Sequence, residues 1–146
     1  MKLFKVAAVA AIVVSASAFA GSVPQYGHGG GGSSGPNSEL SIYQYGSANA
    51  ALALQTDARN SDLTITQHGS ANAADVGQGS DESTIDLLQS GSHNNATLDQ
   101  WNSRESDISV RQFGGGNAAL VNQTASASSV TVQQTGFGNN ATANQY

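Results

Sequence analysis

Five copies of one segment decide the fold. They read SELSIYQYGSANAALALQ (38–55), SDLTITQHGSANAADVGQ (61–78), STIDLLQSGSHNNATLDQ (83–100), SDISVRQFGGGNAALVNQ (106–123) and SSVTVQQTGFGNNATANQ (128–145). The copies begin 23, 22, 23 and 22 residues apart and share the pattern S-x5-Q-x-G-x2-N-x-A-x3-Q. A fixed period of this length is typical of a repeat architecture in which each copy forms one structural unit.

Each copy contains two short stretches in which inward and outward positions alternate. In the first copy, Leu40, Ile42 and Gln44 share one side of an extended segment, and Asn49 and Ala51 begin one side of a second. Alternation with a period of two indicates half-buried strands and not a helix. A glycine recurs after the first stretch, where it indicates a turn with positive φ. The five predicted turn glycines are Gly46, Gly69, Gly91, Gly114 and Gly136.

We therefore predict an all-β fold, a parallel β-solenoid (β-helix) of five strand-turn-strand repeats. One such unit cannot bury its inner face alone, whereas stacked units form two parallel sheets that pack against each other. Neither end of the array carries a polar cap, so both end repeats would present unpaired edges, and stacking would continue as cross-β amyloid on assembly. The predicted repeats cover residues 38–60, 61–82, 83–105, 106–127 and 128–146, with joints such as 56–60 and 79–82.

The predicted interior places aliphatic side chains of the first strands opposite alanines of the second, since large residues facing small ones let two sheets approach closely. Buried amides are costly without partners. Identical amides in successive repeats can hydrogen-bond along the stack as ladders. We assign the inward amides to such ladders and to polymerisation. They are Gln44, Asn49, Gln55, Gln67, Asn72, Gln78, Gln89, Asn94, Gln100, Gln112, Asn117, Gln123, Gln134, Asn139 and Gln145.

The composition excludes several kinds of partner. Beyond the first 20 residues, Leu, Ile, Val and Phe fill 20 of 126 positions, about 16%, which is low for an ordinary globular core. The same part of the chain has no lysine and sets three arginines against ten acidic residues, which argues against nucleic acid and against anionic membranes. The absence of cysteine excludes disulfides and cysteine-ligated metals.

No set of residues suggests catalysis. His28, His68 and His93 occupy unrelated positions and lack metal-ligand spacing. The acidic residues change place from repeat to repeat and form no acid–base pair. We therefore predict no enzyme, no catalytic residue, no metal and no cofactor.

The acidic residues of the second and third repeats have two possible roles. Asp62, Asp75, Asp81, Asp86 and Asp99 are candidate gatekeepers, because acids stacked in register repel each other and slow premature assembly. They would equally serve as solvent-facing residues that keep the chain soluble. The sequence leaves both readings open.

The N-terminal residues have the pattern of a secretory signal. Lys2 and Lys5 precede an apolar run over 6–14, and an A-x-A site ends at Ala20, so we predict a signal peptide over 1–20 cleaved before Gly21. The apolar run is too short to span a membrane. Residues 21–37 are rich in glycine and lack a strand pattern, which predicts a flexible segment.

These repeats, the Gly-rich segment and the closing residues 138–146 resemble the curlin family of enteric bacteria. The resemblance covers the whole chain. It implies the major structural subunit of an extracellular amyloid fibre on the surface of a Gram-negative bacterium, serving biofilm matrix, surface adhesion and host-protein binding. The implied partners are further copies of the chain, a related minor nucleator subunit, an outer-membrane secretion channel with accessory export factors, and host extracellular proteins. Residues 21–37 would engage the secretion apparatus.

The alternative is a monomeric secreted β-solenoid that binds ice or a glycan. Ice binding requires a regular outward array of threonine. The outward column is irregular in this chain, and it reads Ser41, Thr64, Asp86, Ser109 and Thr131.

Overall fold

The computed structural model describes residues 9–15, 38–56 and 59–146. Every regular element in these ranges is a strand, and no helix in them is long and apolar enough to cross a membrane. The strands are β1 (Val9–Ser15), β2 (Glu39–Ser47), β3 (Asn49–Gln55), β4 (Asp62–Ser70), β5 (Ala73–Asp81), β6 (Thr84–Ser92), β7 (Asn95–Arg104), β8 (Asp107–Gly115), β9 (Ala118–Gln123), β10 (Ser129–Phe137) and β11 (Asn140–Gln145).

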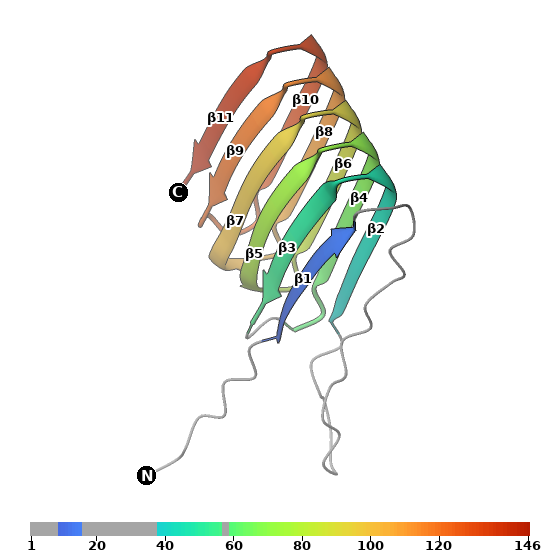
Figure 1. Ribbon diagram of the computed structural model, residues 1–146. Coiled ribbons are helices and arrows are strands. Elements are labelled where there is room, and N and C mark those ends of the chain that lie inside the picture. The colour runs from blue at the N-terminus through green and yellow to red at the C-terminus, as the bar shows by residue number, and fades with distance from the viewer. Residues whose placement is uncertain (1–8, 16–37, 57–58) are drawn as a thin grey trace.

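Each repeat contributes one strand to each of two stacked sheets (Figure 1). One sheet has the order β10-β8-β6-β4-β2 and the other β1-β3-β5-β7-β9-β11. We call the strand pair of one repeat a rung, so that β2 and β3 form rung 1 and β10 and β11 form rung 5. All neighbouring rungs pair in parallel, and equivalent repeat positions face each other, as in Leu63 with Ile85. The predicted parallel β-solenoid is confirmed.

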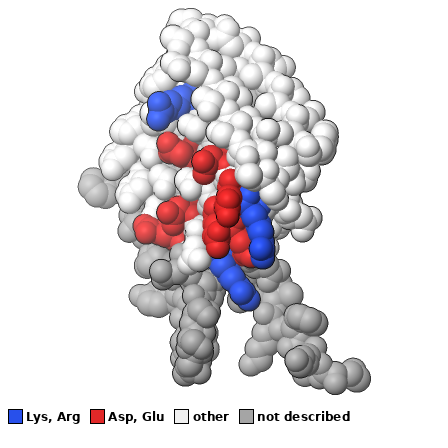
Figure 2. Space-filling model, turned by 180° about the vertical axis from the view of Figure 1, so that it is seen from behind, with Lys and Arg blue, Asp and Glu red and all other residues white. Residues whose placement is uncertain are grey.

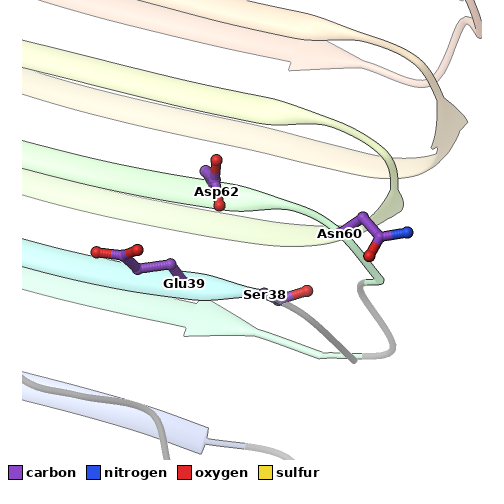
Figure 3. A pocket seen from close by; sticks show the side chains of 4 residues that line it. All are labelled: Ser38, Glu39, Asn60 and Asp62. Atoms are coloured by element: carbon purple, nitrogen blue, oxygen red, sulfur yellow. The ribbon is translucent and has the colours of Figure 1, made fainter. Parts of the chain in front are cut away.

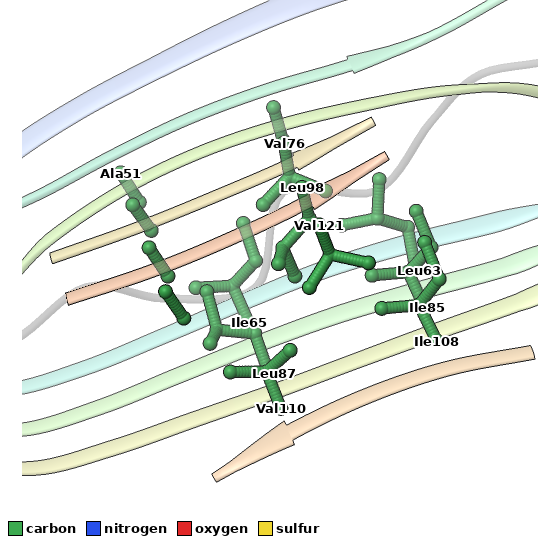
Figure 4. Packing of buried hydrophobic residues seen from close by; sticks show 14 of the residues in the cluster. Ala51, Leu63, Ile65, Val76, Ile85, Leu87, Leu98, Ile108, Val110 and Val121 are labelled. Carbon is green, nitrogen blue, oxygen red and sulfur yellow. The ribbon is translucent and has the colours of Figure 1, made fainter. Parts of the chain in front are cut away.

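The core lies between the sheets, where aliphatic side chains stack in columns along the solenoid axis (Figure 4). Residues of the first strands, such as Ile65 and Leu87, are fully buried, and Ala96 of the second sheet is buried in the same core cluster, as predicted. A second inward column of the same sheet contains larger side chains than the predicted alanines. It contains Ala53, Val76, Leu98 and Val121, all at most 1% exposed. The inner rungs therefore bury more apolar volume than rung 1.

The connection between the two strands of a rung is shorter than the four residues, such as 45–48, that separate the inward glutamine from the inward asparagine in each repeat. Strand β6 continues through Gly91 to Ser92. Only His93 then separates this strand from Asn94, the inward asparagine that directly precedes β7. His93 has φ 56°, and its equivalents in the other rungs also have positive φ. The backbones of the recurring glycines still pair in register from rung to rung. These glycines therefore belong to the ends of the first strands and not to the turns.

The connection from rung 2 to rung 3 also differs from prediction. Residues 79–82 were expected to form a turn, but β5 runs to Asp81 and only Glu82, with φ 54°, turns the chain. The pairing of β5 with β7 is irregular between Gly79 and Asp81. The Trp101 ring covers this stretch, since a Cβ built on Gly77 would lie 2.9 Å from Trp101 Cζ2. A glycine-lined strand with an aromatic cover replaces the expected turn.

One edge of rung 1 is paired, contrary to the expectation that both end rungs have free edges. Strand β1 pairs antiparallel with β3, from Val9 opposite Gln55 to Ser15 opposite Asn49. Strand β1 falls within the predicted signal peptide. The predicted cleavage point after Ala20 and the segment 21–37 lie outside the described residues.

Candidate functional site: amide ladders and the ends of the stack

Two ladders of glutamine side chains run the length of the solenoid interior. In the first sheet, Gln44 Nε2 donates to Gln67 Oε1 at 2.7 Å, and the same bond repeats to Gln89, Gln112 and Gln134 at 2.8, 2.9 and 2.8 Å. The second sheet carries an equivalent column. Its bonds join Gln55 to Gln78, Gln78 to Gln100, Gln100 to Gln123 and Gln123 to Gln145, at 2.8, 3.1, 2.9 and 3.0 Å.

Glutamine side chains also tie the two strands of neighbouring rungs together. Gln67 Nε2 donates to the Ala50 carbonyl at 2.9 Å, and Gln89 Nε2 donates to the Ala73 carbonyl at 2.9 Å. Gln55 Nε2 donates to the Ser61 carbonyl at 3.0 Å, where the chain enters the next rung. Each of these three amide groups therefore satisfies a backbone carbonyl as well as its axial neighbour, which removes the usual cost of a buried polar side chain.

The asparagine ladder runs in the opposite direction. Asn72 Nδ2 donates to Asn49 Oδ1 at 3.1 Å, so here the later rung is the donor. The same Oδ1 accepts the Asn72 backbone N–H at 3.1 Å. Asn72 Nδ2 also lies 3.2 Å from the Gly91 carbonyl. The two bonds to the Oδ1 of the earlier asparagine recur at Asn94, Asn117 and Asn139.

Serines form a further column that our residue assignment missed. Ser61, Ser83 and Ser106 are at most 1% exposed, and each backbone N–H donates to the serine hydroxyl one rung earlier at 3.2–3.3 Å. The signal was available, because a serine begins every copy of the repeat. Ser80 and Ser103 are also buried, and they lie in the strand extensions that the repeat pattern does not contain.

The predicted ladder residues are therefore brought together inside the stack. Those of rungs 1 to 4 are at most 1% exposed, and Gln134 of rung 5 is 6% exposed. Asn139 and Gln145 of rung 5 are half-buried, because no further rung covers them. The core residues Val130 and Val132 of this rung are each 9% exposed, compared with 0% for Ile85 and Leu87. Rung 5 thus presents an incompletely covered interior at its open end.

Charged side chains gather on the part of the solenoid away from rung 5 (Figure 2). Gln112 to Tyr146 contain no Asp, Glu, Lys or Arg. Arg104 contacts Asp81 at 3.6 Å, and its side chain is 75% exposed, so this ion pair adds little stability. The end of the stack that carries rung 5 is therefore free of charge repulsion.

The candidate gatekeepers mostly stack on neutral residues. Asp75 lies between Leu52 and Thr97 in the register, and Asp86 lies between Thr64 and Ser109. Asp81 lies beside the oppositely charged Arg104. Among the five candidates, Asp62 is the one beside a like charge in the strand register, because it lies directly beside Glu39 of rung 1. Both side chains are exposed, and with Ser38 and Asn60 they line a shallow pocket (Figure 3).

We expect Asp62→Asn to shorten the lag before assembly by about twofold at low salt, because like charges directly opposite each other are destabilising and screened by salt. The matched control is Asp107→Asn, at the same repeat position but flanked by Thr84 and Ser129. Lag times measured at low and high salt test this expectation. A difference that persists at high salt, or an equal effect of both variants, would show that Glu39–Asp62 repulsion is not its cause.

Other polar chemistry is sparse in the part of the chain that the structure describes. No group of three or more His, Asp or Glu side chains there is arranged to hold a metal ion. His68 stacks on the Tyr45 ring, with ring centroids 4.6 Å apart. The regular polar features of the described interior are the amide ladders and the serine column.

Comparisons with known proteins agree with this repeat geometry. A family model described as Curlin associated repeat matches residues 35–69, 80–114 and 103–136. The Major curlin subunit of Salmonella typhimurium is 72% identical over 86 residues, which is 56% of this chain and 57% of that protein. The Major curlin subunit of Escherichia coli K12 is 73% identical over 89 residues, 58% of this chain and 59% of that protein.

The chain thus spans less than two thirds of the length of these curated relatives. The three segments matched by the family model together cover more than half of the chain, from rung 1 to rung 5. The chain belongs to the curlin repeat family.

Proposed function

We propose that this protein is a major structural subunit of an extracellular curli-type fibre, in which copies polymerise head-to-tail. The observation that carries this proposal is the repeat of the same interior at both ends of the stack. Rung 5 ends in Asn139 and Gln145 of the same columns that begin with Asn49 and Gln55 in rung 1. A second copy placed on rung 5 would continue every column, and a contact of this kind that does not close produces a filament.

The relatives' name, Major curlin subunit, supports the structural role over an enzymatic one. We further propose that residues 1–20 direct export and that residues 21–37 engage the secretion apparatus. By the same family resemblance, the proposed partners are an outer-membrane channel with accessory export factors, a minor nucleator subunit and host extracellular proteins. The proposed location is the cell surface of a Gram-negative bacterium, where the fibre would serve the biofilm matrix and adhesion.

The monomeric ice- or glycan-binding solenoid is less well supported. The outward column next to the core of the first sheet mixes Thr64, Asp86 and Ser109, so it offers no regular threonine array. A monomeric solenoid also needs ends that exclude further strands. Rung 5 has no such cover among the described residues.

Seeded growth tests the proposed function. We expect the exported, processed chain to show a lag in thioflavin T fluorescence that shortens with concentration and disappears when preformed fibres are added. The physical reason is that a free chain must close its long-range pairings before stacking is rewarded, whereas a seed supplies a finished edge. Immediate, concentration-independent β-structure with no seeding would favour the monomeric solenoid and contradict a fibre subunit.

A further inference from the structure

The two kinds of amide ladder have opposite hydrogen-bond directions, and this makes the two ends of the stack different. In each glutamine ladder the earlier rung donates through Nε2 to Oε1 of the later rung. In the asparagine ladder the later rung donates through Nδ2 to Oδ1 of the earlier rung. In each ladder, one end rung is therefore left with a hydrogen-bond acceptor and the other end rung with a hydrogen-bond donor.

Gln55 holds the glutamine end group of rung 1. Its Nε2 is used by Gln78 Oε1 and the Ser61 carbonyl, while its Oε1 is buried and has no hydrogen-bond partner among the described residues. A buried amide oxygen without a donor is costly. Rung 1 therefore presents an acceptor that needs a donor from outside the five rungs.

Gln145 holds the matching group of rung 5. Its Oε1 accepts from Gln123 Nε2 at 3.0 Å, which directs its amide nitrogen toward the open end of the column. Gln145 is half-buried, unlike its fully buried equivalents below it. Rung 5 therefore presents a donor in the column in which rung 1 presents an acceptor.

The asparagine column supplies the reverse pair. In every inner rung, an asparagine Oδ1 accepts both the backbone N–H and the Nδ2 of the next asparagine, as Asn117 Oδ1 does from Asn139 at 3.1 and 2.9 Å. Asn139 Oδ1 is the next acceptor in this series. Asn49 carries the corresponding donors at rung 1, where its Nδ2 already contacts the Tyr45 and Gly69 carbonyls.

We propose that these opposed ladders form a polar recognition surface for a second copy of this chain, with Gln145 of one copy donating to Gln55 of the next and Asn49 of the next donating to Asn139. This inference rests on the proposed fibre function and assigns its junction. Contacts between two rung 5 ends would set donor against donor in the glutamine column and acceptor against acceptor in the asparagine column. The ladders therefore select one orientation of the incoming subunit.

Strand β1 occupies one side of this junction. It pairs with β3 on the edge that an incoming β11 would need, with Val9 opposite Gln55. The acceptor of Gln55 becomes available to another copy only when β1 leaves this edge. Removal of the predicted signal peptide on export would free it.

Gln145→Glu tests the assignment with an almost isosteric change. The carboxylate keeps an oxygen to accept from Gln123 within the chain, but it replaces the outward donor by a second acceptor facing Gln55 of the next copy. We expect seeded growth at neutral pH to slow by about tenfold or more, because the buried acceptor of Gln55 is left without a donor and faces a second acceptor. The matched control is Asn144→Asp, which adds the same charge to the exposed face of the same strand and is expected to grow like the unaltered chain.

Growth at acidic pH separates lost direction from a damaged fold. A protonated carboxyl can donate again, so we expect the growth rate of Gln145→Glu relative to Asn144→Asp to recover below about pH 4, near the usual pKa of glutamate. Equal growth of the two variants at neutral pH would overturn the inference and leave the proposed function intact, as would an equal slowing of both or a defect that acid does not reverse. If the unaltered chain shows no seeded growth, the proposed function fails first, and the inference fails with it.

Discussion

Gly91→Ala is expected to abolish seeded assembly. Gly91 has φ +124°, a conformation that costs an alanine about 1–2 kcal/mol or more. The new Cβ would also overlap the Gly114 carbonyl oxygen of the next rung and lie 2.8 Å from its carbon. Backbone cannot move aside as the end of a side chain can, so rungs 3 and 4 would have to separate locally.

The control for this substitution is Gly116→Ala. Gly116 has φ +65°, and the nearest atom to its added Cβ is Gly138 N at 3.9 Å. Ala48 and Ala71 already occupy the equivalent position in rungs 1 and 2 with φ 55°. We expect Gly116→Ala to assemble almost as the unaltered chain does, measured by seeded thioflavin T kinetics. Similar failure of both variants would mean that positive φ, and not the contact between rungs, sets the requirement for glycine.

Gln89→Ala is expected to lower the stability of the assembled form by roughly 3 kcal/mol or more, since each orphaned buried group costs about 1–3 kcal/mol. The change removes the acceptor of Gln67 Nε2 and the donors to Gln112 Oε1 and the Ala73 carbonyl. Gln89 is 0% exposed, so water cannot replace these bonds without opening the stack. The guanidinium concentration at which fibres dissolve measures the loss.

Ser90→Ala is the matched control for Gln89→Ala. Ser90 is the next residue of β6, it points to the outer face and it is half-buried. Its removal should change the dissolution midpoint little, because surface substitutions away from special features have small effects. If the two variants dissolve at the same concentration, the axial amide bonds do not contribute measurably to stability.

The repeat pattern was sufficient to predict the strands, their parallel register and the inward amides. Equivalent residues recur at a nearly constant spacing, so pairing Leu63 with Ile85 also pairs Gln67 with Gln89. A one-residue slip would turn both outward, and a buried face therefore specifies the register strongly. The alternation within each strand and the pairing between rungs therefore place the same residues in the interior.

Features that break the repeat could not be predicted in the same way. The extension of β5 to Asp81 depends on a contact from the following rung, where Trp101 covers Gly77 and Gly79. Nothing within residues 79–82 signals that contact, and their Gly and Ser content is typical of a turn. The pairing of β1 with β3 was missed because an apolar run after two lysines has the pattern of an export signal, which carries no information on strand pairing.

The ladder directions were also beyond sequence reasoning. The pattern shows that Gln and Asn recur, but not which end of each amide faces the next rung. That choice follows from the backbone carbonyls nearby, since Gln67 reaches Ala50 while Asn72 reaches His68 and Gly91. These carbonyls come within reach of the amides only when the rungs have stacked.

Gly136 differs from its four equivalents in one respect. A Cβ on Gly46, Gly69, Gly91 or Gly114 would meet the backbone of the following rung, but on Gly136 its nearest contact is Asn139 Nδ2 at 3.6 Å. In a continuous fibre, the following rung belongs to another molecule. A side chain at this position would add the strain of a φ of +110° but no backbone clash within its own chain. It would obstruct the neighbouring subunit, so that a small fraction of altered subunits would act as chain terminators. The steric constraint at Gly136 is then a property of the polymer, and a mixed population of subunits would reveal it where a study of the isolated chain would not.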